Sequence, residues 1–358
     1  MRPVPAACLP CDCAAINEQG GEIMISGFQH VGIGVRDMER SYDFYKRYMG
    51  FTLKLNDHQR FEKEMKYIIG DLVEMRILMA MNAAGGGALE LVQHTSTPCR
   101  EPAKPIEWGD IGVLEVGFKA FRLEELHASL TAQGVNFITP VRTMKLSKGG
   151  SIRYVYLRDP DGLLIQLVEE QGGRRPMVGG VVHAAIGVSD LETACDFYSR
   201  IAGFSTVLHM SDETSGMDEI TGGKRTRMAI LKQPSGLPAN LPMIESGSVK
   251  LIQTPDYHGK SIYDGRRWGD LGCMEIAIDV TGLRDVYNGM LAAGAKDYCP
   301  PTRIDMGSGS IGSFAYVNDP DGNILEMVDV EKIMFMPPSI FKNIIIWPIK
   351  AAASLGLI

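Results

Sequence analysis

The sequence predicts an α+β fold in which one structural unit occurs twice along the chain. The first observation is a set of motifs that recur in the same order: residues 30–51 at 183–204, residues 108–118 at 268–278, and residues 156–168 at 316–328. The second is the length of 358 residues, which exceeds what one hydrophobic core usually organises. The repeated order of the motifs therefore predicts a tandem duplication rather than two unrelated domains.

The repeats set the expected domain boundaries. We expect one domain over residues 27–170 and a second over 180–330, joined by a Gly/Arg/Pro-rich linker over 171–179. Each domain is expected to superpose on the other as an eight-stranded unit. The first 26 residues are expected to be a disordered tail, although Cys8, Cys11 and Cys13 resemble half of a zinc site.

The last segment, residues 331–358, is apolar but interrupted. Pro337, Pro348 and Lys350 are among the residues that break the run, and a membrane-spanning helix needs roughly 20 uninterrupted apolar residues. We therefore expect no transmembrane helix. A tail that packs on a partner subunit in a homodimer, or that lies on a membrane surface, remains open.

Each copy is expected to follow the order strand, helix and three strands, twice over. In the first copy, residues 28–35 form a strand, and residues 37–50 form a helix whose apolar residues recur every three or four positions. The second round begins with a strand at 113–121 and a helix at 122–134, followed by strands near 135–140, 151–157 and 163–169. The sequence Asp-Pro-Asp-Gly before the last strand predicts a tight hairpin turn.

Composition excludes several classes of function. Hydrophobic residues make up 45% of the chain and charged residues 22%, which is sufficient for full cores. A net charge of −7 without a long basic stripe argues against nucleic acid as a partner. Seven scattered cysteines in a long chain do not form a disulfide framework, so we expect a reducing, cytoplasmic location.

The motifs resemble the vicinal oxygen chelate superfamily. The resemblance is carried by the H-x-x-[IV]-x-V openings, the DFY helices, the G-x-x-E strands and the DPDG hairpins, and it covers about 300 of the 358 residues. This superfamily includes glyoxalase I, methylmalonyl-CoA epimerase, extradiol dioxygenases, and bleomycin and fosfomycin resistance proteins. The resemblance implies two tandem domains built from four βαβββ modules.

The resemblance also implies eight strand positions that could hold a metal. The first copy offers His30, Glu90, Glu115 and Gln166, and the second offers His183, Lys250, Glu275 and Glu326. These polar residues stand within aliphatic strands, where a buried carboxylate is costly unless it is paired or bound to metal. Lys250 departs from the pattern because a protonated ammonium cannot ligate a cation. One of the two sites is therefore expected to be degenerate.

Two ways of assembling the modules remain open. If each copy closes its own barrel, His30, Glu90, Glu115 and Gln166 form one site. If modules pair across the copies, one site contains His30, Glu90, Glu275 and Glu326. The other then contains Glu115, Gln166, His183 and Lys250. His30 and Glu90 belong to the better site in both arrangements.

We expect one divalent ion per chain, because one of the two sites is degenerate. An imidazole with oxygen donors suits Zn, Ni, Co, Mn or Fe and indicates no preference for a metal that binds thiolates. By resemblance, we expect a lyase or isomerase that enolises a small substrate chelated through vicinal oxygens, with Glu90 and Glu326 as candidate bases. The alternatives are an Fe(II) extradiol-type dioxygenase and a binding or resistance protein without turnover. The two WGD segments at Trp108 and Trp268 are interpreted as turn anchors or as part of a substrate mouth.

Overall fold

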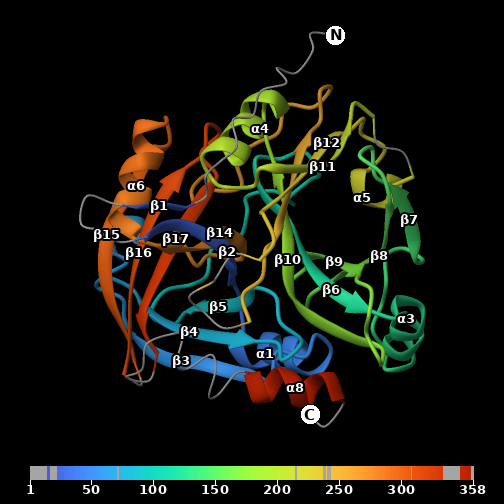
Figure 1. The fold of residues 1–358 in the computed structure, drawn as a ribbon, viewed down its shortest axis with the longest axis horizontal. Helices are drawn as coiled ribbons and strands as arrows, with labels where there is room; N and C mark the ends of the chain where they lie inside the picture. Colours follow the sequence, from blue (N-terminus) through green and yellow to red (C-terminus); the bar gives the residue numbers. More distant parts are fainter. Residues whose placement is uncertain are drawn as a thin grey trace.

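Two curved β-sheets with helices packed beside them form the molecule (Figure 1). The computed structural model describes residues 14–16, 22–70, 72–213, 216–236, 239, 243–307, 309–333 and 347–355. The first sheet has the order β15 (Lys296–Gly307), β16 (Ser310–Asn318), β17 (Ile324–Lys332), β14 (Gly272–Thr281), β2 (Glu22–Gly34), β5 (Ala88–His94), β4 (Glu74–Met81) and β3 (Leu53–Phe61), with β1 (Ala14–Ile16) paired to β2. The second has the order β11 (Thr206–Ser211), β12 (Arg227–Lys232), β13 (Ser248–Gln253), β10 (Met177–Gly187), β6 (Gly112–Phe121), β9 (Leu164–Glu169), β8 (Ser151–Arg158) and β7 (Arg142–Lys145).

Each sheet takes one module from each copy of the repeat. The first sheet joins β2–β5 to β14–β17, and the second joins β6–β9 to β10–β13. The α+β class and the four βαβββ modules are confirmed. The expectation that each copy forms its own eight-stranded unit is wrong, because the central antiparallel pairs β2·β14 and β6·β10 connect modules from different copies.

The described helices are α1 (Met38–Arg47), α2 (Lys66–Ile69), α3 (Leu123–Ala132), α4 (Leu191–Arg200), α5 (Asp218–Thr221), α6 (Leu283–Ala292) and α8 (Trp347–Leu355). Helices α1, α3, α4 and α6 follow the predicted pattern of one helix per module, whereas the short helices α2 and α5 and the C-terminal helix α8 were not predicted. Helix α1 begins where the side chain of Asp37 accepts a hydrogen bond from the backbone N–H of Arg40 at 3.0 Å. Its buried face carries Met38, Tyr42 and Tyr45, which sit at three- and four-residue steps.

The two DPDG hairpins are equivalent, as predicted. In each one the first aspartate accepts hydrogen bonds from the backbone two and four residues later, at 2.9 and 2.8 Å. The second oxygen of Asp159 accepts from the hydroxyl of Tyr45 at 3.0 Å, and that of Asp319 accepts from Tyr198 at 3.2 Å. Both tyrosines belong to the DFY motif of the same copy but to a module in the other sheet. These contacts therefore tie the two sheets together.

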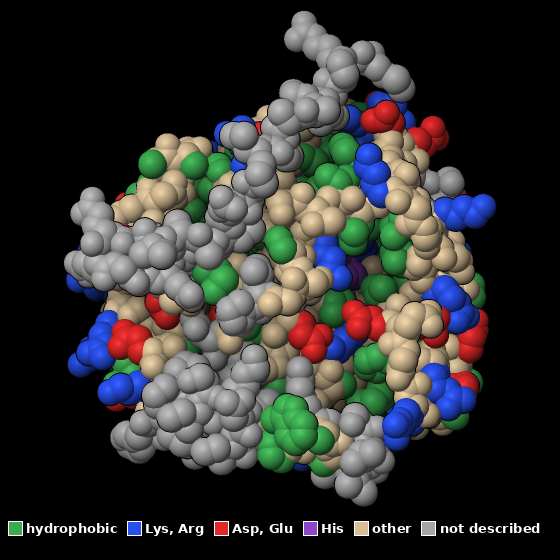
Figure 2. Space-filling model, viewed as in Figure 1, with side chains coloured by type: hydrophobic (Ala, Val, Ile, Leu, Met, Phe, Trp, Pro, Cys, Tyr) green, Lys and Arg blue, Asp and Glu red, His purple; other side chains and the backbone are tan. Residues whose placement is uncertain are grey.

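The main core lies between the sheets and the helices. It is a continuous buried cluster that takes residues from all four modules, including Phe28, Phe118, Phe204 and Leu325. Phe28 and Phe204 meet edge to face with ring centroids 6.5 Å apart. On the face shown in Figure 2, Lys and Arg side chains are interspersed with Asp and Glu.

The two ends of the chain differ in part from expectation. The sequence predicts disorder over residues 1–26, but β1 and the first residues of β2 form a paired antiparallel ladder. Cys8, Cys11 and Cys13 lie outside the described residues. At the other end, Ile349 of α8 packs against a cluster that contains Met81 and Val330. No helix in the described ranges is both long enough and apolar enough to cross a membrane.

Candidate metal centre

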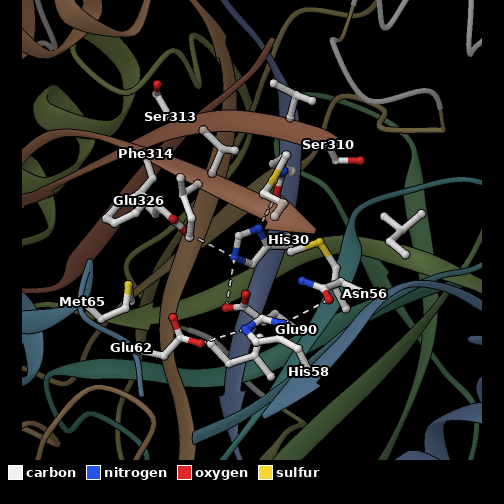
Figure 3. Close-up of a pocket in the computed structure, with 18 of the residues that line it drawn as sticks. His30, Asn56, His58, Glu62, Met65, Glu90, Ser310, Ser313, Phe314 and Glu326 are labelled. Atoms are coloured by element: carbon white, nitrogen blue, oxygen red, sulfur yellow. Dashed lines mark hydrogen bonds and ion pairs between the residues drawn. The ribbon is translucent and has the colours of Figure 1, made fainter. Parts of the chain in front are cut away.

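Four strands of the first sheet bring His30, Glu90, Glu275 and Glu326 together. In the ladder, His30 on β2 lies opposite Ala277, which in turn lies opposite Glu326 on β17. Two residues further along β2, Gly32 lies opposite both Glu90 on β5 and Glu275 on β14. Because residues two apart on a strand share a face, the two rows place all four side chains on one side of the sheet. Figure 3 shows Glu326 to the left of His30 and Glu90 below it.

The polar atoms of this group converge without satisfying one another. The Nε2 atom of His30 lies 3.1 Å from Glu326, 3.7 Å from Glu90 and 3.8 Å from Glu275. Nε2 of His30, Oε1 of Glu275 and Oε2 of Glu326 are nevertheless buried and have no hydrogen-bond partner of acceptable geometry. Ligand atoms of these three residues all lie within 4.8 Å of one another. Buried polar atoms left without partners are costly, so their convergence is typical of a cation site.

The electrostatics of the group favour an additional positive charge beside the carboxylates. Burial, together with the charge of Glu275 and Glu326, raises the pKa of Glu90 to about 8. Burial and the charge of Glu326 raise the pKa of Glu275 to about 7. Burial lowers the pKa of His30, but the surrounding carboxylates outweigh it and hold that pKa well above its usual value. Without an additional cation, the carboxylates repel one another and retain protons.

Two further side chains orient the candidate ligands. A bulge opposite Ala277 and Ile278 places Gln29 beside His30, and the Gln29 side-chain oxygen contacts Nδ1 of the imidazole. This contact leaves Nε2 free to face the carboxylates. The indole N–H of Trp268 donates to Oε2 of Glu275 at 2.5 Å, which leaves Oε1 of Glu275 directed at the group. Trp268 therefore supports the candidate site in addition to beginning a turn.

The corresponding residues of the second sheet form a hydrogen-bonded network around a Lys250–Glu115 ion pair. The ammonium of Lys250 donates to Oε1 of Glu115 at 2.5 Å and to Gln166 at 2.9 Å. His183 contacts the same Glu115 oxygen through Nε2 at 2.8 Å. Although burial raises the pKa of Glu115, Lys250 and His183 outweigh burial and hold it at about 2. Of the two arrangements left open by the sequence, the structure shows the one with modules paired across the copies.

Small residues make the two sites different in shape. Gly117 lies opposite His183, and a Cβ at Gly117 would stand 1.9 Å from the imidazole ring, so the ring occupies the space beside the strand. The matching partner of His30 is Ala277, whose methyl group fills that space. Val182 also stands at the bulge where the first sheet has Gln29. The second site therefore lacks the orienting amide as well as the fourth acceptor.

A cavity of about 380 Å³ opens beside the first group. His30, Glu90 and Glu326 line it, whereas Glu275 does not. The side-chain exposures agree, at 13% for Glu90, 8% for Glu326 and 0% for Glu275. Volumes of this size are typical of small-molecule sites. A molecule in the cavity would therefore meet two of the three carboxylates.

Polar residues on the edge strand β3 also line the cavity, and the sequence analysis missed them. Asn56, His58 and Arg60 alternate along β3 and point inward with Glu62, as Figure 3 shows for Asn56, His58 and Glu62. His58 bonds Glu62 at 2.7 Å and Asn56 at 3.0 Å, while Arg60 donates to Glu62 at 3.1 Å. The alternation itself was the available signal, but alternating polar residues on a strand ordinarily indicate a solvent-exposed face.

Replacing Gln29 by Val, the residue found at the equivalent bulge, is expected to weaken zinc binding by about 10- to 100-fold, because the imidazole loses the amide that orients it. Competition with a chromophoric chelator measures this affinity. Val182→Gln is the matched control and should leave zinc binding unchanged, since Lys250 still occupies the second site. Equal zinc affinity in Gln29→Val and the natural protein would remove the orienting role from Gln29.

Comparisons with known proteins agree with this architecture. A family model described as Glyoxalase/Bleomycin resistance protein/Dioxygenase superfamily matches residues 27–167 and 180–327. No curated protein sequence matches the chain. Among solved structures, a mutant form of glyoxalase I from Zea mays is similar at 18% identity, covering 85% of this chain and 94% of that one with a TM-score of 0.55. A putative dioxygenase from Bacillus subtilis is similar at 14% identity, covering 88% and 89%, with a TM-score of 0.57. At these identities the likeness concerns the fold.

Proposed function

Because the chain belongs to the glyoxalase/bleomycin resistance protein/dioxygenase superfamily, we propose that it is a divalent-metal-dependent lyase or isomerase. Its substrate is a small molecule bound through two neighbouring oxygens. The observation that carries the proposal is the convergence of three buried, unpartnered polar atoms from His30, Glu275 and Glu326 beside a cavity. Of the two sheets, only the first offers such a group among the described residues.

The donor set fits a divalent cation. One imidazole and three carboxylates suit Zn, Ni, Co, Mn or Fe(II), and none of these four donors is a thiolate. His30, Glu275 and Glu326 would hold the ion, with Glu90 as the fourth ligand. Bound there, the ion supplies a Lewis acid that polarises the substrate oxygens and acidifies the adjacent C–H bond.

The three carboxylates differ in exposure, and this difference suggests different roles for them. Glu275 is fully buried and fixed by Trp268, so it can hold charge but cannot reach a substrate carbon. Glu90 and Glu326 face the cavity and can accept a proton and return it. The buried position of the group limits competition from water. These two glutamates are therefore the proposed bases of a redox-neutral proton transfer.

The test is proton exchange without oxygen. With zinc-loaded protein in deuterated water, an α-hydroxy ketone should exchange the hydrogen beside its carbonyl, as followed by NMR. At equal zinc content, Glu326→Gln should slow the exchange by about 10²- to 10⁴-fold while substrate binding changes little, because the amide oxygen of glutamine can still ligate the ion but cannot serve as the base. Glu331→Gln, on the exposed end of the same strand, is the matched control and should exchange at the natural rate.

Two outcomes would contradict the proposal. Exchange that is unchanged in Glu326→Gln would remove this residue as the base. Turnover that requires iron and consumes oxygen would replace the lyase or isomerase with the dioxygenase alternative.

A further inference from the structure

The walls of the cavity define what the body of the substrate must be. They are apolar over most of their extent, with Ile77 and Met79 from β4 facing Ile304, Phe314, Val328 and Val330 from β15, β16 and β17. Desolvating a charged group against such walls is costly unless an opposite charge receives it. A negatively charged group of a bound molecule is therefore tolerated only where the cavity offers a positive charge to pair with it.

The cationic side chains of the cavity are already engaged. Besides His30, the described lining residues that can carry positive charge are Lys54, His58 and Arg60. His58 and Arg60 share the buried carboxylate of Glu62, at 2.7 and 3.1 Å. Lys54 pairs with Asp57 at 2.6 Å and lies over the ring of Tyr42, 4.7 Å from its centroid. Each of the three therefore already contacts a carboxylate.

The end of the cavity that holds the candidate metal ligands also disfavours an anionic ligand. This argument rests on the proposed function, because it assumes a bound divalent ion. The carboxylates of Glu90, Glu275 and Glu326 carry one negative charge more than a divalent ion neutralises. An anionic ligand that enters beside Glu90 and Glu326 would therefore be repelled by the remaining negative charge, and the low dielectric of the site strengthens this repulsion.

We propose that the substrate is an uncharged, mainly apolar vicinal-oxygen compound, such as an aryl or branched-alkyl dione or hydroxy ketone. Its two oxygens lie at the end lined by His30, Glu90 and Glu326, and its apolar body lies between the Met79 and Phe314 walls. Asn56, Ser310 and Ser313 also line the cavity and add polar groups without formal charge. Thiol conjugates and acyl thioesters that carry several carboxylates or phosphates do not fit this charge pattern.

A pair of ligands with the same body tests the charge preference. Calorimetry on the zinc-loaded protein compares 1-(2-naphthyl)propane-1,2-dione with 2-naphthylglyoxylate, which replaces the methyl group by a carboxylate oxygen. The neutral dione should bind at least about tenfold more tightly, because the added carboxylate charge meets the net negative charge that remains when one divalent ion is held by three glutamates. Equal or tighter binding of the glyoxylate overturns the inference.

A second ligand separates this inference from the proposed function. The monoketone 2-acetylnaphthalene lacks vicinal oxygens, so its binding to metal-free protein reports on the apolar walls alone. If the protein holds no metal but binds this ketone, the proposed function fails and the apolar cavity stands. If the ketone does not bind, the inference fails whatever the metal does.

A matched pair of variants places the effect in the cavity. Ile304 on β15 and Met144 on β7 occupy equivalent, partly exposed positions on the outer strands of the two sheets, paired with Gly312 and Ile152. Ile304→Lys adds a free cation to the cavity and should tighten glyoxylate binding at least about fivefold while weakening the dione. Met144→Lys should change neither affinity. If both variants change binding alike, the ligands are not recognised by the first cavity.

Discussion

The Lys250→Glu variant is expected to bind two zinc ions per chain, where the proposed function predicts one for the natural chain. In the second sheet, the ammonium of Lys250 occupies the point toward which Glu115, Gln166 and His183 converge. The substitution removes the internal cation and supplies a fourth donor of the type present at Glu90. Without metal, the two buried carboxylates repel each other, so the variant should lose about 3–5 kcal/mol of unfolding free energy.

Zinc addition should then restore much of that stability, since an ion that binds only the folded state raises its midpoint of thermal unfolding. Zinc content by mass spectrometry and thermal unfolding with and without zinc make the measurement. Lys232→Glu makes the same charge change at a partly exposed position of β12 and should show neither effect. Lys250→Gln, which adds no charge, keeps the test available if the first variant folds poorly. One ion per chain and no zinc-dependent stabilisation in both Lys250 variants would refute the idea that Lys250 fills the second site.

Replacing His30 by Ala is expected to reduce the zinc content from about one ion per chain to near zero after dialysis. His30 is the side chain that lies within 3.8 Å of each of the three carboxylates, and its removal leaves them mutually repelling. Proton exchange should fall to background in the same variant. The measurement is metal content together with exchange rate.

His183→Ala is the matched control, because His183 occupies the same position on the equivalent strand of the other sheet. It should retain zinc, since Lys250 still satisfies Glu115. Stoichiometric zinc in His30→Ala, or loss of zinc in His183→Ala alone, would place the metal elsewhere.

The repeats and the hairpins could be predicted from the sequence because their signals are local. The DPDG turns and the DFY helices each depend on residues within a few positions of one another. The pairing of modules could not be predicted, because every βαβββ module presents the same apolar strands to either neighbour. Which strand lies beside β2 depends on long-range packing, and the ladder to β14 spans more than 200 residues of sequence.

The candidate ligands were also predictable, because Glu90, Glu275 and Glu326 are carboxylates inside aliphatic strands. Their supporting residues were not. Gln29 reaches His30 through a bulge, and a strict two-residue alternation would place it on the opposite face. Asn56 and His58 have the spacing of a solvent-exposed face, and only the curvature of the first sheet turns that face into a cavity.

The pairing of modules across the copies has a consequence for the intact fold. The segment from residue 171 to 176, between β9 and β10, is the point at which a protease cut would separate the two repeats. Each fragment would then contribute half of both sheets, so neither could leave without opening the β2·β14 and β6·β10 ladders. A nicked molecule should therefore migrate as one particle under native conditions and as two bands after denaturation. The two copies of the repeat therefore associate through both sheets, as the subunits of an intertwined dimer do. The linker keeps them in one chain and is not a hinge between two separate domains.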